Sequence, residues 1–118
     1  MSSIKYPYET KPTKQILFSL ISDGSGDASQ ESKLIQGVIQ RVIITPGAGV
    51  SANFTVAIFD ENGMDILQSD ANAGIICSST TEMVELRPQT HVTDILTCTI
   101  AGLGDTKTCE VAVYWTED

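Results

Sequence analysis

The stretch "ANFTVAIFDENGMDIL", residues 52–67, is the strongest fold signal in this chain. Its first part alternates so that Phe54, Val56 and Ile58 share one face of an extended strand. An acidic cluster around an Asn-Gly pair at 62–63 follows, and the apolar run "MDIL" comes next. Asn-Gly between two apolar runs is the strongest short-range signal of a β-hairpin. The stretch therefore predicts two antiparallel strands joined by a tight turn.

The acidic cluster in this hairpin has two interpretations. A type I′ turn centred on Asn62-Gly63 would place Asp60 opposite Asp65, and like charges facing each other are unfavourable. In one solution a wider loop separates the acids, and Asp60 or Asp65 accepts backbone N–H groups as in an Asx turn. In the other, Asp60, Glu61 and Asp65 share a Ca²⁺. The spacing is not that of an EF-hand, so the turn is favoured and no metal is assigned.

The same alternation recurs on both sides of this hairpin, with turn residues at short intervals. Segment 33–46 is apolar on both faces and is expected to be central, with Gly37 marking a bulge or bend. Pro46 and Pro88 are expected to end strands. The strands expected are 15–22, 33–46, 52–60, 64–68, 75–79, 81–88, 94–102 and 109–117. Within the last, Val111, Val113 and Trp115 share a face, and Trp115 is expected in the core.

About eight strands without a helical period predict an all-β fold. The expected architecture is an antiparallel β-sandwich or barrel, with a jelly-roll sandwich of about eight strands as the leading candidate. Apolar residues make up 42 % of the 118 residues and charged residues 19 %, which argues against disorder. No apolar run approaches the ~20 residues of a membrane span. The start also lacks the apolar core of a signal peptide. We therefore expect a soluble protein made in a cytoplasm.

Charge is unevenly distributed along the chain. Residues 1–14 carry Lys5, Lys11 and Lys14 against Glu9, while the other residues carry four basic and fourteen acidic side chains. The net charge of -8 argues against binding to nucleic acid. Pro7 and Pro12 favour an extended segment over a helix. The sequence thus predicts an extended arm, residues 1–14, before one β-sandwich domain, residues 15–118. The arm is either a frayed terminus or a docking element for an acidic neighbour.

Few other residues suggest chemistry. Cys77, Cys98 and Cys109 lack metal-ligand spacing. Cys98 and Cys109 would face each other on paired strands if "AGLGDTK" forms a turn, so a disulfide is conceivable, although buried thiols are expected. His91 precedes Asp94 by three residues, but nothing places a nucleophile beside it, so a surface position is expected. The tripeptides "GSG", "GAG" and "GLG" precede strand-like sequence and predict no phosphate loop. We therefore expect neither an enzyme nor a cofactor.

The segment "GVIQRVIITPGAGVSANFTVAIFDENGMDIL", residues 37–67, resembles small virion proteins of tailed bacteriophages. In that family a strand ends in Pro, and a loop of small residues follows. Next comes Asn-aromatic-x-Val-x-apolar-x-Asp-x-x-Gly-x-Asp-apolar-Leu. The matching positions are Pro46, 47–51, Asn53, Phe54, Val56, Ile58, Asp60, Gly63, Asp65, Ile66 and Leu67, with Ala71-Asn72 shortly afterwards. The resemblance covers about a quarter of the chain, without the arm or the last fifty residues.

This resemblance implies a structural role in a phage particle. Size, all-β pattern and arm are also similar to jelly-roll cement, or decoration, proteins, which staple neighbouring major-capsid subunits from outside the shell. The implied partner is the phage major capsid protein, and the implied location is the capsid exterior. Self-association as a dimer or trimer is expected. The resemblance implies no catalytic residues.

The arm supplies the candidate interface. Tyr6 and Tyr8 are expected to anchor it, because aromatic residues are enriched at interface centres. Lys5, Lys11 and Lys14 are expected to pair with an acidic shell. Two alternatives stay open: a head–tail neck or tail structural protein, and a Ca²⁺- or carbohydrate-binding β-sandwich module that uses the Asp60–Asp65 loop. Neither nucleic acid nor a membrane is an expected partner.

Overall fold

The computed structural model describes residues 14–67, 74–78 and 82–117, and for residues 82–91 it describes the backbone only. The regular structure in this part is entirely β-strand, which confirms the expected all-β class. The strands are β1 (Lys14–Ile21), β2 (Ala28–Pro46), β3 (Phe54–Phe59), β4 (Ile75–Cys77), β5 (Glu82–Ala101) and β6 (Thr108–Glu117). No helix that could cross a membrane occurs among the described residues. The arm residues 1–13 lie outside them.

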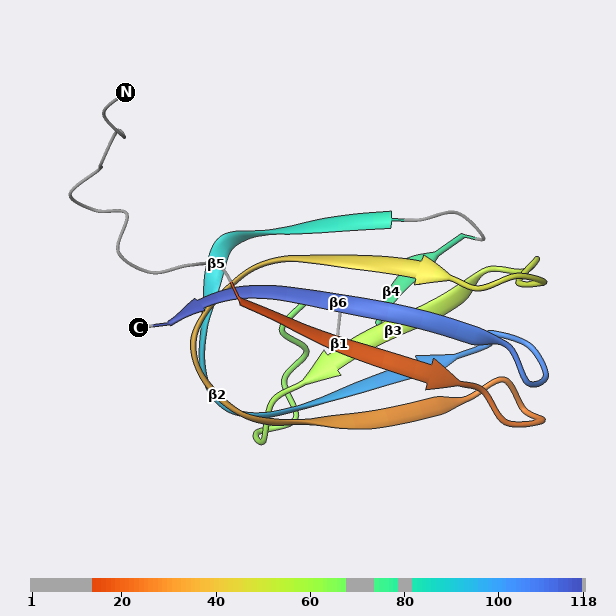
Figure 1. Ribbon diagram of the computed structural model, residues 1–118, viewed down its shortest axis with the longest axis horizontal. Coiled ribbons are helices and arrows are strands. Elements are labelled where there is room, and N and C mark those ends of the chain that lie inside the picture. The colour runs from red at the N-terminus through yellow and green to blue at the C-terminus, as the bar shows by residue number, and fades with distance from the viewer. Residues whose placement is uncertain (1–13, 68–73, 79–81, 118) are drawn as a thin grey trace, which may run out of the picture.

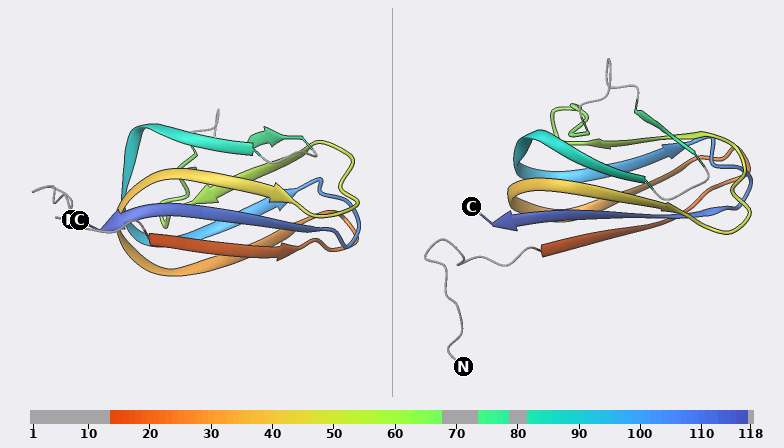
Figure 2. Two further views of the ribbon diagram at one scale, coloured as in Figure 1. Left: turned by 45° about the horizontal axis from the view of Figure 1, so that its top comes forward. Right: turned by 90° about the horizontal axis from the view of Figure 1, so that it is seen from above.

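The strands form one antiparallel sheet in the order β1-β6-β2-β5-β3-β4. Between residues 37 and 44, β2 pairs with both β5 and β6, as expected for a central strand, whereas residues 28–36 pair with β5 alone. Figure 1 shows the two long strands, β2 and β5, bending at the same end of the molecule. The sheet thereby curls until its two halves face each other, as both views in Figure 2 show.

Breaks in the strand register explain the shared bend. On β2 the register passes from Ile39 to Arg41, while on β5 it passes from Thr90 to Glu85. Pro88 lies in this unpaired part of β5, where its missing N–H removes no ladder hydrogen bond. The prediction that Pro88 ends a strand is therefore wrong. The two strands expected at 81–88 and 94–102 are one continuous strand.

The prediction of about eight separate strands is corrected to six strands in the described residues. Besides the continuous β5, β2 begins at Ala28, inside a stretch that looked like a polar loop. Its first residues are mostly exposed because they lie at a sheet edge. The expected strand at 64–68 is reduced, within the described residues, to a single bridge between Phe59 and Asp65.

The core lies between the facing halves of the sheet. Phe54, Val56 and Ile58 are buried together on β3, as are Val111, Val113 and Trp115 on β6, which confirms both predicted faces. The largest side chains that are almost wholly buried are Phe18, Phe54, Ile35, Ile39, Ile44, Ile58, Leu96 and Leu103. Burying one such side chain stabilises a fold by about 1.5–3 kcal/mol. This core positions the ends of β1, β2 and β6 relative to one another.

Of the two roles expected for Gly37, a bulge or a bend, the bulge is not present at this residue. The β2 register is continuous through it, and the register shift lies between Ile39 and Arg41. A Cβ at Gly37 would lie 2.1 Å from the Thr116 carbonyl oxygen and 2.7 Å from Cε3 of Trp115. Glycine is needed here because β6 and its tryptophan approach the β2 backbone closely.

Candidate functional site

The Asn-Gly hairpin has a wider loop than the type I′ turn predicted. The Asp60 N–H donates to the Met64 carbonyl at 3.0 Å, and the Gly63 N–H donates to the Asp60 carbonyl at 3.1 Å. Gly63 has φ of +80°, but Asn62 is not among the residues with positive φ. This pattern is a three-residue loop closed by a left-handed glycine. A type I′ turn does not form, because only one loop residue takes positive φ, and the wider loop given as its alternative is confirmed.

The wider loop separates the three acids. Asp60 Oδ1 accepts the N–H groups of Asn62 and Met64 at 2.9 and 3.0 Å, which confirms the predicted Asx turn. Asp65 Oδ1 accepts the N–H groups of Ile58 and Leu67, both at 3.0 Å. Glu61 instead accepts the Ile95 N–H at 3.2 Å. Each carboxylate serves different backbone donors, and the described residues contain no group of three potential metal ligands.

The cysteines lie in the core. Cys77, Cys98 and Cys109 are buried thiols, which confirms the expected burial. Cys98 and Cys109 do not face each other on paired strands, as a tight turn at "AGLGDTK" would have required, because β2 lies between β5 and β6 in the sheet. Burial, aided by the nearby Cys109 thiol, raises the pKa of Cys98 well above its usual range. Burial, followed by the Glu110 carboxylate, raises the pKa of Cys109 to about 11. These thiols are poor nucleophiles at neutral pH.

His91 lies on β5. Its backbone pairs with Val38 on β2, but its side chain is outside the described part of the structure. Asp94 lies on the same strand and pairs with Ile35. The expectation that His91 is a surface residue stays a prediction.

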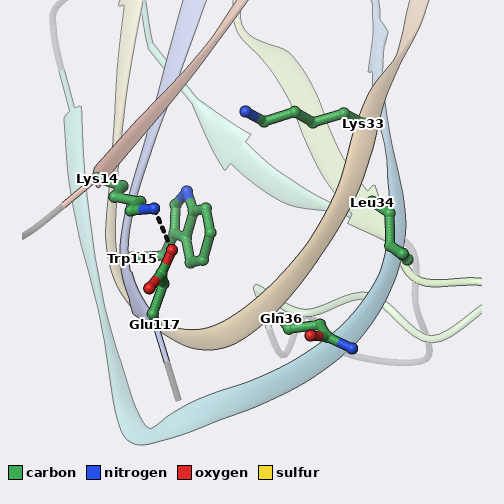
Figure 3. Close-up of a pocket in the computed structure, with 6 residues that line it drawn as sticks. All are labelled: Lys14, Lys33, Leu34, Gln36, Trp115 and Glu117. Atoms are coloured by element: carbon green, nitrogen blue, oxygen red, sulfur yellow. Dashed lines mark hydrogen bonds and ion pairs between the residues drawn. The ribbon is translucent and has the colours of Figure 1, made fainter.

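A pocket of about 500 Å³ lies where β1 begins and β6 ends (Figure 3). We call it the end pocket. Its lining residues are Lys14 from β1, Lys33, Leu34 and Gln36 from β2, and Trp115 and Glu117 from β6. Lys14 and Trp115 are register partners, and Glu117 follows two residues later on the same face of β6. The sheet curl brings residues 33–36 of β2 opposite them.

A β-bulge shapes the β2 wall of the end pocket. The β2 register shifts between Glu31 and Leu34, and the Ser32 hydroxyl oxygen accepts the Leu96 N–H at 3.0 Å within this break. Bulges re-aim side chains. Here Leu34 is 58 % exposed, whereas the next residue, Ile35, is buried in the core. The bulge therefore leaves an apolar side chain and the neighbouring Lys33 at the pocket instead of in the core.

The end pocket is polar, and two of its groups, Trp115 Nε1 and the Lys33 ammonium, have no partner among the described residues. Lys14 forms an ion pair with Glu117, and its Nζ lies 5.5 Å from the centroid of the Trp115 ring. Trp115 is only 6 % exposed, and its buried Nε1 has no hydrogen-bond acceptor among the described residues. Figure 3 shows the Lys33 side chain extending from β2 across the pocket, toward the wall that carries Lys14 and Trp115. No carboxylate in the described residues forms an ion pair with Lys33.

The structure places one predicted interface residue, Lys14, in this pocket. The others, Lys5, Tyr6, Tyr8 and Lys11, lie outside the described residues. Sequence reasoning missed the end pocket itself, although it placed Trp115 correctly in the core. The residues missed are Lys33, Leu34, Gln36 and Glu117. Their only sequence signal is the adjacent "KL" after a polar run, and without the bulge that pattern predicts an ordinary exposed strand edge.

Comparison with known proteins places the fold in a broad class. No protein-family model matches the sequence, and no curated protein matches it. Among solved structures, one similar chain comes from the crystal structure of Tomato aspermy virus, with 8 % identity and a TM-score of 0.51. The match covers 96 % of this chain and 81 % of that chain. This chain therefore shares an all-β fold with a viral structure.

Two further chains are similar. A chain from Bacillus endospore appendages, described as disulfide-linked pili, has 13 % identity and a TM-score of 0.51, covering 100 % of this chain and 98 % of that chain. A chain from the virus-like particle of the extra small virus of the prawn Macrobrachium rosenbergii has 11 % identity and a TM-score of 0.40, covering 100 % and 86 %. At these identities the likeness extends to the fold alone.

Proposed function

We propose that this chain is a structural protein of a virion and acts by binding neighbours, without catalysis. The observation that carries the proposal is the likeness of fold to a chain of a viral structure, in a match that covers 96 % of this chain. The resemblance of residues 37–67 to small virion proteins of tailed phages supports the same role independently of the fold. Within this role we assign the chain to capsid cement, or decoration, proteins that staple neighbouring major-capsid subunits from outside.

The strand pairing supports a jelly roll as the architecture of this cement protein. The two bent strands, β2 and β5, each contribute to both facing halves of the sheet. Counting each half separately gives one layer of β1, β6, residues 37–46 and residues 82–90. The other layer comprises residues 28–36, residues 91–101, β3 and β4. Two facing layers of four strands are the jelly-roll arrangement.

The basic arm is the proposed docking element for the capsid. The chain is acidic overall, with a net charge of -8, but Lys5, Lys11 and Lys14 are concentrated in its first residues. A basic segment on an acidic body can bind an acidic neighbour, while the net negative charge of the body keeps the free protein soluble. Ordering the arm costs about 1–2 kcal/mol per residue, so it is expected to order only when it docks.

The test is co-sedimentation with assembled capsid shells. The full chain is expected to pellet with shells, and a variant lacking residues 1–13 is expected to stay in the supernatant. Lys14 is kept because it pairs with Trp115 in the β1–β6 register and forms an ion pair with Glu117. An unchanged melting midpoint would show that the truncated body is folded. If the truncated chain still pelleted with shells, the arm would not be the docking element.

A neck or tail position in the same particle is the first alternative. Electron microscopy of particles labelled at this protein separates the two, because cement covers the whole shell whereas a neck protein lies at one vertex. Label over the shell supports the cement proposal, and label confined to one vertex overturns it.

A filament subunit is a second candidate, favoured by the match that spans 98 % of the endospore-appendage chain. That family is described as disulfide-linked, whereas all three cysteines here are thiols buried in the core, out of reach of a neighbouring chain. A filament of this chain would need another linkage. Negative-stain imaging of the purified chain is expected to show discrete particles, and long filaments would favour this second candidate.

A Ca²⁺- or carbohydrate-binding module at the Asp60–Asp65 loop is the remaining alternative. The carboxylates of Asp60, Glu61 and Asp65 accept backbone N–H groups in separate places. EDTA is therefore expected to leave the melting midpoint unchanged. A ligand bound only to the folded state raises the midpoint, so a clear drop with EDTA would favour the metal module.

A further inference from the structure

The end pocket has the size and chemistry of a binding site. Its volume of about 500 Å³ falls within the range of ligand pockets. Trp115 offers an indole N–H, which is a donor only and has no acceptor in the described structure. Buried tryptophan nitrogens usually find a partner, so a carbonyl or hydroxyl oxygen is the missing group. An occupant with such an oxygen would satisfy it after a small movement of the covering Lys14 side chain.

The charges of the end pocket define the occupant further. Lys14 is already paired with Glu117, which leaves the positive charge of Lys33 uncompensated among the described residues. Leu34 adds an exposed apolar side chain to the wall. The pocket therefore suits a segment that combines aromatic or apolar side chains, an oxygen acceptor and one carboxylate.

We propose that the end pocket of one copy binds residues 6–9 of a second copy of this chain. These residues are Tyr-Pro-Tyr-Glu, and Glu9 is the only acidic residue in the first fourteen. Glu9 pairs with Lys33, and a tyrosine hydroxyl or a backbone carbonyl accepts the Trp115 N–H. Proline at position 7 lowers the entropic cost of docking because it restricts the free segment.

The connection of the arm to Lys14 explains why the occupant comes from a second copy. Lys14, the last residue of the arm, lines the end pocket of its own copy. In an extended chain at about 3.1–3.4 Å per residue, residues 6–9 lie roughly 15–27 Å from Lys14. Pro7 and Pro12 favour such extension. The segment thus reaches a neighbouring copy, while Lys5 and Lys11 on either side stay available to an acidic shell.

A charge-reversal cycle in the full-length chain tests this exchange without any capsid. Self-association is measured by sedimentation velocity over a concentration series, together with emission from Trp115, the only tryptophan. Glu9→Lys and Lys33→Glu should each weaken self-association by about tenfold or more, because each removes a charge pair and creates a like-charge contact. The double variant, which carries both reversals, should recover most of the affinity.

The design contains its own controls. Lys107→Glu makes the same change in net charge away from the pocket and should leave self-association unchanged. Glu9→Lys lowers the magnitude of the net charge, which by itself would favour association, so a weakening is specific to the contact. Tyr6→Ser with Tyr8→Ser should weaken association and remove the concentration-dependent change in Trp115 emission.

Three results would overturn the proposal. These are a wild-type chain that stays monomeric at all concentrations, single reversals without effect, and a double variant that does not recover. A change in Trp115 emission that depends on Glu9 but not on concentration would assign the segment to its own pocket instead. Because no shell is present, failure here is distinguishable from failure of the capsid-binding test.

Discussion

Gly63 gives a residue-scale test of the hairpin loop. Its φ of +80° lies in the left-handed region, and a Cβ there would meet nothing within 4 Å. Replacing it with valine should therefore lower the free energy of unfolding through backbone strain alone, by about 1–2 kcal/mol. The measurement is urea unfolding followed by circular dichroism.

Gly24 is a control position without a left-handed backbone. A Cβ at Gly24 also meets nothing within 4 Å, but its φ is not positive. Gly24→Ala should leave stability unchanged or raise it by less than about 1 kcal/mol. Equal effects at the two glycines would contradict the loop conformation described for residues 60–64.

Asp65 is the buried carboxylate that holds the second side of the hairpin. It is 6 % exposed and accepts the N–H groups of Ile58 and Leu67. Asp65→Ala leaves both donors unsatisfied and should cost about 2–4 kcal/mol of stability. Asp65→Asn keeps one acceptor oxygen and should cost less than half of that. Chemical denaturation of the three chains side by side measures both effects, and equal losses would show that the hydrogen bonds are not the cause.

At the scale of elements, β2 and β6 approach each other closely at Gly37. A methyl group at Gly37 would collide with the Thr116 carbonyl and the Trp115 ring. Gly37→Ala should therefore destabilise the protein by about 1–3 kcal/mol, as overpacking does. It should also shift the emission of Trp115, which the Gly24→Ala control should not. A native spectrum and midpoint for Gly37→Ala would mean that β6 does not approach β2 as described.

The two long strands, β2 and β5, contain register breaks that their local sequences do not predict. Pro88 normally stops a strand, yet β5 passes through it because the ladder to β2 is interrupted between Glu85 and Thr90. The bulge between Glu31 and Leu34 similarly turns part of a polar stretch into the wall of the end pocket. Strand number and pocket position both depend on these interruptions.

At the scale of the whole molecule, the core controls the chemistry of the thiols. The pKa of Cys109 is raised to about 11, and that of Cys98 is raised further, mainly by burial. A thiol reagent at pH 8 is therefore expected to leave Cys98 and Cys109 unmodified in the native protein. After denaturation it is expected to modify all three cysteines. Prompt reaction of the native protein would contradict their burial.

The same burial predicts how stability depends on pH. The unfolded thiols ionise near the ordinary cysteine pKa of 9.0, whereas the folded thiols stay protonated until higher pH. The unfolded state then binds fewer protons, so stability is lost as pH rises from about 9 toward 11. A Cys109→Ala variant should lose less stability across this interval than the native chain. Urea midpoints of both chains at pH 8 and pH 10.5 test this. An equal drop in midpoint for the native chain and for Cys109→Ala would contradict the prediction.

The all-β class, the inward faces of β3 and β6 and the burial of the cysteines followed from the sequence. Alternation with a period of two is local, and it persists in any sheet that buries one face. The Asx turn at Asp60 was also foreseeable, because its partners lie within four residues. Such features need no knowledge of the rest of the chain.

The tertiary structure alone decided which strands pair, where β2 and β5 bend and which residues line the end pocket. Trp115 and Lys33 are 82 positions apart in the sequence, and they line one pocket only because a bulge and a shared bend curl the sheet. Bulges and register breaks depend on strand partners that are distant in sequence, so a local pattern carries no signal of them. The sequence by itself determined a sheet with one apolar face; the pairing of distant strands determined how that sheet closes and what it can hold.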